Sequence, residues 1–137
     1  MLWVALATCL VLVSSCNASS DTPQTPAGNQ SNLDLTSIPL EQALSSGKPT
    51  LAEFGRGVCA PCKAMKPILE ELAVEYKDKL NVVIVEIDEH PDLTNQYRIM
   101  AIPTQILFDS SGKEIARHMG FCAKEEIIAQ LQKMGID

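Results

Sequence analysis

Residues 53–65 read EFGRGVCAPCKAM, and the fold prediction starts from this segment. Pro49 to Phe54, which overlaps the start of this segment, reads as a buried strand that ends in Gly55. Downstream, apolar residues recur with the period of an amphipathic helix from Pro61 through Leu80. The cysteines Cys59 and Cys62 therefore lie where a strand gives way to the start of a helix.

This position controls how reactive the cysteines are. The unpaired amides and positive dipole end of a helix stabilise a thiolate, and thiols in this setting can titrate well below the free value of about 8.5. Cys62, one turn further into the helix, faces the same side and can close a small disulfide ring with Cys59. Pro61 is tolerated because amides of the first helical turn have no partner within the helix. The pattern predicts a dithiol in which Cys59 attacks a disulfide, a mixed disulfide forms, and Cys62 resolves it.

Other uses of such a pair stay open at this point. A zinc site needs four ligands, and beyond the pair the folded part offers only Cys122, His90 and His118, none in a second close pair, so we expect no metal. Haem attachment requires a histidine directly after the second cysteine, where the chain has Lys63. A static disulfide would close too short a loop to restrict the unfolded chain much. A module that binds a partner protein or Cu(I) through its thiols, without turnover, is the main alternative to an enzyme.

Helices and strands alternate along the rest of the chain. We expect a short helix over Leu40–Leu44, a strand over Asn81–Ile87, a short helix over Pro91–Tyr97, strands over Thr104–Phe108 and Glu114–Met119, and a last helix over Lys124–Lys133. The turn DSSG at 109–112 joins the last two strands as a hairpin. This order predicts an α/β fold with a mixed central sheet covered by helices on both faces.

With these motifs in place, the segment from about Leu40 to Met134 resembles the thioredoxin family. The resemblance is carried by Cys59-Ala60-Pro61-Cys62-Lys63, Ile87-Asp88-x-x-Pro91, Ala101-Ile102-Pro103-Thr104, the Gly112 hairpin and Gly120, which occur in the family's order and spacing. It implies a thioredoxin-like fold and a thiol-disulfide oxidoreductase. It also implies that no cofactor is needed beyond the redox-active disulfide of Cys59 and Cys62.

The resemblance assigns further site residues. It implies that the peptide bond before Pro103 is cis, that Pro103 packs beside the cysteines, and that the backbone of Ile102 pairs with substrate like an added strand. Glu53 matches a buried acid that exchanges protons with Cys62, and burial would raise its pKa toward the working pH. The expected substrate groove consists of Ala60, Pro61, Ile102 and Gly120.

The sequence also departs from the family's pattern. Before the first cysteine it carries GRGV (residues 55–58) in place of the usual tryptophans, and Ala60 stands in place of a glycine. The lysine that often accompanies the buried acid falls at Ile84, so Glu53 should lack a positive partner and be easier to protonate. The family's first strand is faint. We expect a specialised protein that reduces disulfides of client proteins, with electrons from a membrane thiol carrier.

The N-terminus predicts export. Met1 to Val13 is apolar and uncharged but too short to span a bilayer, which needs about 20 apolar residues. With Ser14 and Ser15 before Cys16, it resembles a bacterial lipoprotein signal in which Cys16 is acylated and becomes the new N-terminus; an ordinary cleaved signal or an uncleaved anchor is the alternative. We expect a signal peptide over 1–15, a flexible tether over 16–33 and a thioredoxin-like domain over 34–137. The protein would then be extracytoplasmic and lipid-anchored to a bacterial membrane, at the periplasm or the cell surface.

Composition narrows the classes of partner. The chain has 137 residues with 11 Lys plus Arg against 17 Asp plus Glu, so it is an acidic single domain that cannot form the basic stripe needed for nucleic acid. We expect a monomer. Cys122, two residues beyond Gly120, is either a small buried residue or a third redox-active thiol. His90 and His118 are expected at the surface.

Overall fold

The computed structural model describes residues 33–137. The predicted signal peptide (1–15), the lipidation site Cys16 and nearly all of the predicted tether (16–33) lie outside the described residues. Those three predictions therefore stay predictions. Within 33–137, no helix is both long and apolar enough to cross a membrane.

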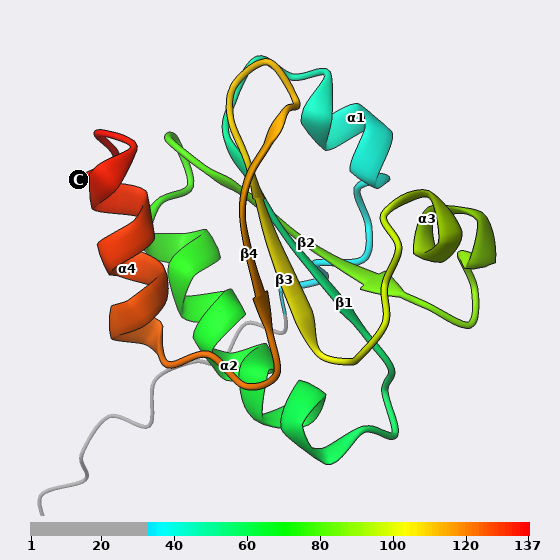
Figure 1. The fold of residues 1–137 in the computed structure, drawn as a ribbon. Coiled ribbons are helices and arrows are strands. Elements are labelled where there is room, and N and C mark those ends of the chain that lie inside the picture. The colour runs from blue at the N-terminus through cyan, green and yellow to red at the C-terminus, as the bar shows by residue number, and fades with distance from the viewer. Residues whose placement is uncertain (1–32) are drawn as a thin grey trace, which may run out of the picture. The chain divides into compact units, whose positions relative to one another are not determined.

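The described residues alternate helices and strands in the expected order (Figure 1). The elements are α1 (Leu40–Leu44), β1 (Thr50–Gly55), α2 (Ala60–Glu75), β2 (Asn81–Glu86), α3 (Pro91–Gln96), β3 (Thr104–Phe108), β4 (Glu114–Met119) and α4 (Lys124–Lys133). Seven of the eight elements begin and end within one residue of the expected positions, but α2 ends well before Leu80. The chain leaves the helix at Tyr76 because Leu80, only 2% exposed, must return to the core where β2 begins.

The sheet is mixed, with strand order β2-β1-β3-β4. β1 runs parallel to β2 and antiparallel to β3, and β3 forms the expected hairpin with β4. Gly112, at φ +80°, occupies the left-handed position that closes the hairpin turn. Because β1 is central, its end at Gly55 delivers the chain to α2 from the middle of the sheet.

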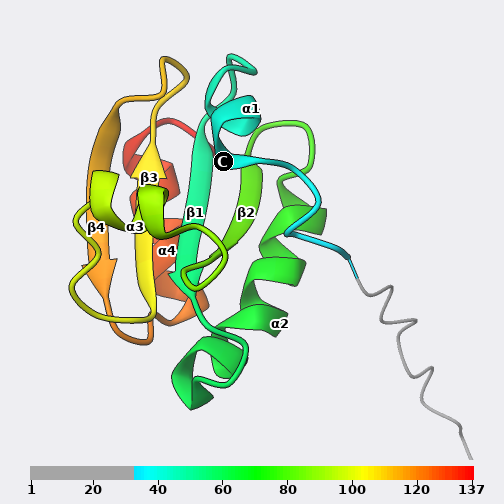
Figure 2. The same cartoon turned by 90° about the vertical axis from the view of Figure 1, so that its right-hand side faces the viewer.

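Helices cover both faces of this sheet (Figures 1 and 2). On one face, α2 and α4 bury a cluster that includes Leu51, Leu69, Leu107 and Leu131. On the other face, α1 and α3 bury a second cluster, whose members are Leu40, Ala43, Ala52, Phe54, Val83, Val85, Leu93, Ile106 and Phe108. Along β1, Leu51 belongs to the first cluster and Ala52 and Phe54 to the second, as the two-residue period of a strand requires. The two-sided α/β sheet predicted from the sequence is confirmed.

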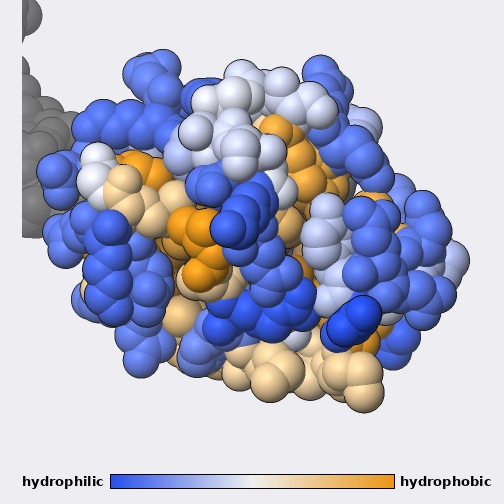
Figure 3. Space-filling model, turned by 45° about the horizontal axis from the view of Figure 1, so that its top comes forward, coloured by the Kyte–Doolittle hydropathy of each residue, from blue (hydrophilic) through white to orange (hydrophobic). Residues whose placement is uncertain are grey.

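One backbone hydrogen bond ties the start of the described chain to the sheet. Leu35 is 7% exposed, and its carbonyl accepts a hydrogen bond of 3.0 Å from the Ile84 amide at the free edge of β2. Single pairing of this kind caps the edge of the sheet without extending it. The face in Figure 3 shows hydrophilic side chains with hydrophobic ones visible between them.

Candidate active site

Cys59 and Cys62 form a disulfide at the start of α2. Cys59 is the N-cap residue, with an extended backbone, and its Sγ accepts a hydrogen bond of 3.3 Å from the Cys62 amide. Pro61 occupies the first turn, where a missing amide hydrogen leaves no helical bond unmade. The Cα atoms of the two cysteines lie 5.3 Å apart, within the usual range for a disulfide. The cap geometry therefore directs a helix amide at the sulfur that the sequence predicts to be the attacking one.

The two sulfurs differ in how far solvent reaches them. Cys62 is 7% exposed, whereas Cys59 is half-buried and is flanked by the exposed residues Val58 and Ala60. A bulky partner can therefore approach Cys59 but not Cys62. This asymmetry fits an attacking thiol at Cys59 and a resolving thiol at Cys62.

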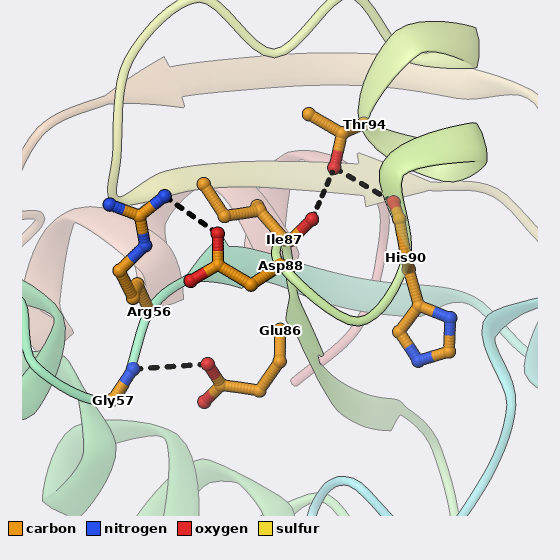
Figure 4. Close-up of polar contacts among 7 residues, drawn as sticks. All are labelled: Arg56, Gly57, Glu86, Ile87, Asp88, His90 and Thr94. Atoms are coloured by element: carbon orange, nitrogen blue, oxygen red, sulfur yellow. Dashed lines mark hydrogen bonds and ion pairs between the residues drawn. The ribbon is translucent and has the colours of Figure 1, made fainter.

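Polar contacts hold the loop that delivers Cys59 (Figure 4). The Arg56 guanidinium lies 2.7 Å from Asp88 Oδ1, and the Gly57 amide donates to Glu86 Oε2 at 3.0 Å. Both acids come from the end of β2 and the turn that follows it. The chain has no tryptophan here, so charge and hydrogen bonding, not aromatic packing, fix this loop against its neighbour. The sequence singled out the GRGV segment as unusual but gave no means of pairing it with Glu86 and Asp88.

Glu53 is buried on β1, with 2% of its surface exposed. Burial raises its pKa from 4.5 to about 7, with a smaller contribution from the negative charge of Glu86. One carboxylate oxygen, Oε1, has no hydrogen-bond partner. The expected burial and the expected shift in the pKa of Glu53 are both present, and a carboxyl group that titrates near neutral pH can both accept and return a proton. Its proton exchange with Cys62 stays a prediction.

Gly55 makes room for this carboxyl group. A Cβ atom at residue 55 would lie 2.7 Å from Glu53 Oε1, so the Glu53 side chain leans along the strand over Gly55. That direction leads toward the end of β1, where the loop to Cys59 begins. Sequence reasoning used Gly55 only as the end of a strand and missed this role.

The neighbours of Glu53 across the sheet are Ile84 on β2 and Gln105 on β3. Ile84 stands where the family often has a lysine, so the neighbour of Glu53 on β2 is apolar. Gln105 is 4% exposed, and neither its amide nitrogen nor its amide oxygen has a hydrogen-bond partner. Its place within an apolar strand gave no sign in the sequence that it would lie beside the buried acid.

The segment before β3 brings three predicted residues together. The Ile102–Pro103 peptide bond is cis, Pro103 is buried, and Ile102 is partly exposed. The Gly120 amide donates to the Pro103 carbonyl at 2.7 Å. Thr104 pairs with Phe54 near the end of β1. The segment before β3 therefore lies at the same end of the sheet as the loop that leads to Cys59. The roles of Ala60, Pro61, Ile102, Pro103 and Gly120 toward a substrate stay predictions.

Cys122 is the free cysteine of the described residues and is 5% exposed. Burial raises its pKa to about 11, with help from the nearby Glu126. A thiol that keeps its proton at neutral pH is a poor nucleophile, which favours a buried residue over a third exchanging thiol. His90 and His118 are both exposed, as expected.

Comparison with known proteins identifies the relatives of this chain. A family model described as Thioredoxin matches residues 33–133. The chain is 40% identical over 99 residues to a thioredoxin of Alicyclobacillus acidocaldarius subsp. acidocaldarius, which covers 72% of this chain and 93% of that protein. It is 46% identical over 88 residues to a thioredoxin of Acidithiobacillus ferridurans, covering 64% and 81%, and 34% identical over 99 residues to a thioredoxin of Staphylococcus aureus, covering 72% and 93%.

The matched region contains the whole sheet, α2 and the disulfide of Cys59 and Cys62. These relatives and this disulfide support the same activity, thiol-disulfide exchange, and a redox-active disulfide needs no external cofactor for it. The chain therefore belongs to the thioredoxin family and is a thiol-disulfide oxidoreductase.

Proposed function

We propose that this oxidoreductase reduces disulfide bonds of client proteins outside the cytoplasm, as a monomer tethered to a membrane by lipid on Cys16. The observation that carries attack on the client by Cys59, with Cys62 resolving, is the difference in exposure at the disulfide: Cys59 is half-buried and Cys62 is 7% exposed. The tether and the location rest on the sequence pattern of residues 1–33.

The proposed reaction moves two electrons from the chain to the client. The Cys59 thiolate attacks one client sulfur, breaks the client disulfide and releases the other client sulfur as a thiolate. Cys62 loses its proton to the Glu53 carboxylate and attacks Cys59 Sγ, which frees the second client sulfur and forms the disulfide of Cys59 and Cys62. A membrane thiol carrier then returns two electrons to that disulfide.

Exposed apolar side chains support a protein as the client. Val58 is 80% exposed, Met100 86%, Met119 62% and Phe121 50%. Each is close in sequence to a predicted site residue: Val58 precedes Cys59, Met100 lies two residues before Ile102, and Met119 and Phe121 flank Gly120. Apolar surface of this kind is typical of sites that bind other proteins. The backbone of Ile102 would pair with an extended client segment.

Trapping the mixed disulfide tests the reductase role. Cys62→Ser should accumulate a covalent adduct with clients, because the bond to Cys59 is no longer resolved. Cys59→Ser should form no adduct and lose insulin reduction, whereas the matched control Cys122→Ser should reduce insulin at the normal rate. Normal insulin reduction by Cys59→Ser would overturn the assignment of the two cysteines.

A separate experiment tests the tether. Cys16→Ser should abolish incorporation of labelled fatty acid and move the protein from the membrane fraction to the soluble fraction, while the control Cys9→Ser leaves both unchanged. Continued lipid labelling of Cys16→Ser would refute the lipid anchor but leave the reductase role standing.

A further inference from the structure

Three metal-binding side chains meet at the junction of β4 with α4. His118 lies near the end of β4, Cys122 in the connection, and Glu126 in the first turn of α4. One ligand atom from each residue lies within 4.8 Å of the other two. Among residues 33–137 this is the one such group of three or more. In the sequence these residues are spaced by three intervening positions, which does not by itself place them on one side of the chain.

The separations suit tetrahedral zinc. Bond lengths of about 2.3 Å to sulfur and about 2.0 Å to nitrogen or oxygen place ligand atoms about 3.3 to 3.6 Å apart around the ion. Cys122 Sγ and Glu126 Oε2 are 3.5 Å apart. The ring nitrogen of His118 lies at most 4.8 Å from the Cys122 and Glu126 ligand atoms. Because the His118 ring is exposed, it can move, and a shift of at most about 1.5 Å would bring it to the separation that zinc requires.

Two of the three side chains are held in place by a hydrogen bond to the backbone. His118 Nε2 lies 3.0 Å from the Phe121 carbonyl, which can only accept, so Nε2 carries the hydrogen and Nδ1 keeps its lone pair. Glu126 Oε2 accepts a hydrogen bond of 3.2 Å from the Ala123 amide. Contacts of this kind hold metal ligands in place in known sites.

A cavity of about 320 Å³ adjoins the three residues. Its walls include His118, Cys122 and Glu126, and also Gln105, which is the cross-strand partner of His118. Gln105 is 4% exposed, and neither polar atom of its side-chain amide has a hydrogen-bond partner. A buried amide without partners is costly unless something polar lies against it. Gln105 therefore places a polar side chain in the wall of the cavity that the three residues share.

We propose that His118, Cys122 and Glu126 bind one zinc ion, with a fourth position open to water in the cavity beside Gln105. Imidazole nitrogen, thiolate sulfur and carboxylate oxygen are the ligand types that Zn²⁺ takes in proteins. On binding, the Cys122 thiol gives its proton to solvent and the sulfur bonds to the metal. The site is separate from the dithiol, because none of its three ligands is Cys59 or Cys62.

The test uses the full-length chain with the disulfide of Cys59 and Cys62 kept oxidised, so that the dithiol cannot bind the metal. Isothermal titration with Zn²⁺ and absorbance titration with Co²⁺ are run on the wild type and on His118→Ala, Cys122→Ser and Glu126→Gln. Each substitution should weaken Zn²⁺ binding at least about tenfold, since even loss of a supporting residue costs that much. Cys122→Ser should also remove the sulfur-to-cobalt charge-transfer band.

The matched controls are His90→Ala and Glu125→Gln, which change the other histidine and the neighbouring exposed acid and should bind Zn²⁺ like the wild type. His118 and Glu126 are exposed, so their variants test the site even if Cys122→Ser does not fold. Binding that is absent from the wild type, or equally strong in His118→Ala and Glu126→Gln, would overturn the proposal.

Discussion

The buried carboxyl group of Glu53 makes a measurable prediction about stability. Because the pKa of Glu53 is raised from 4.5 to about 7, the folded protein binds more protons than the unfolded chain between those two values. The free energy of unfolding should therefore fall as the pH rises through this window. At about 1.4 kcal/mol for each pH unit, the shift corresponds to a loss of about 3 kcal/mol above pH 7 relative to pH 4.

Glu53→Gln isolates this effect. Glutamine has nearly the same shape but cannot ionise, so its own burial cost is the same at every pH. The difference in the free energy of unfolding, variant minus wild type, should be constant below about pH 4.5, rise by about 3 kcal/mol up to about pH 7, and then level off.

Urea denaturation of the oxidised protein from about pH 4 to about pH 9 measures this difference. The control is Glu125→Gln, which makes the same substitution at an exposed acid in α4 and leaves the buried carboxyl group in place. A flat profile for Glu53→Gln, or a difference that falls with pH, would show that the carboxyl group is not held in its neutral form by burial.

Three further substitutions test the surroundings of Glu53 and the Cys59 loop. Gly55→Ala places a Cβ 2.7 Å from Glu53 Oε1 and should lower the free energy of unfolding by about 1 to 3 kcal/mol; unchanged urea denaturation would mean that the carboxyl group has another position open to it. Gln105→Leu removes two buried amide atoms without partners and should raise stability by about 1 to 3 kcal/mol in the presence of a chelator, whereas a loss of stability would reveal a partner for that amide. Arg56→Ala breaks an ion pair whose side chains are 43% and 61% exposed, so the global stability should change by less than about 1 kcal/mol; hydrogen exchange of the Gly57 and Cys59 amides should still quicken, and unchanged exchange would show that Asp88 does not hold the loop.

Most of the fold could be predicted because its signals are local. The β-branched run at 81–86, the DSSG turn and the helical period of 124–133 each depend on residues close in sequence, and each element lies where it was expected. The predicted end of α2 was wrong by five residues: we expected Leu80, and the helix ends at Glu75. The helix stops where Leu80 can return to the core, and the helical period does not contain that information. Boundaries depend on packing against distant segments, which a local pattern does not contain.

The chemistry of the site follows from residues close together in the chain: two cysteines separated by two residues at a helix start, and an acid six residues before the first of them on a strand. The surroundings of these groups depend on how distant segments pack. The strand register places Ile84 and Gln105 beside Glu53. The connection between β4 and α4 brings His118, Cys122 and Glu126 close together. The reason is physical: helix caps and turns form from neighbouring residues, whereas burial, desolvation and contacts between strands exist only after distant parts of the chain have packed together.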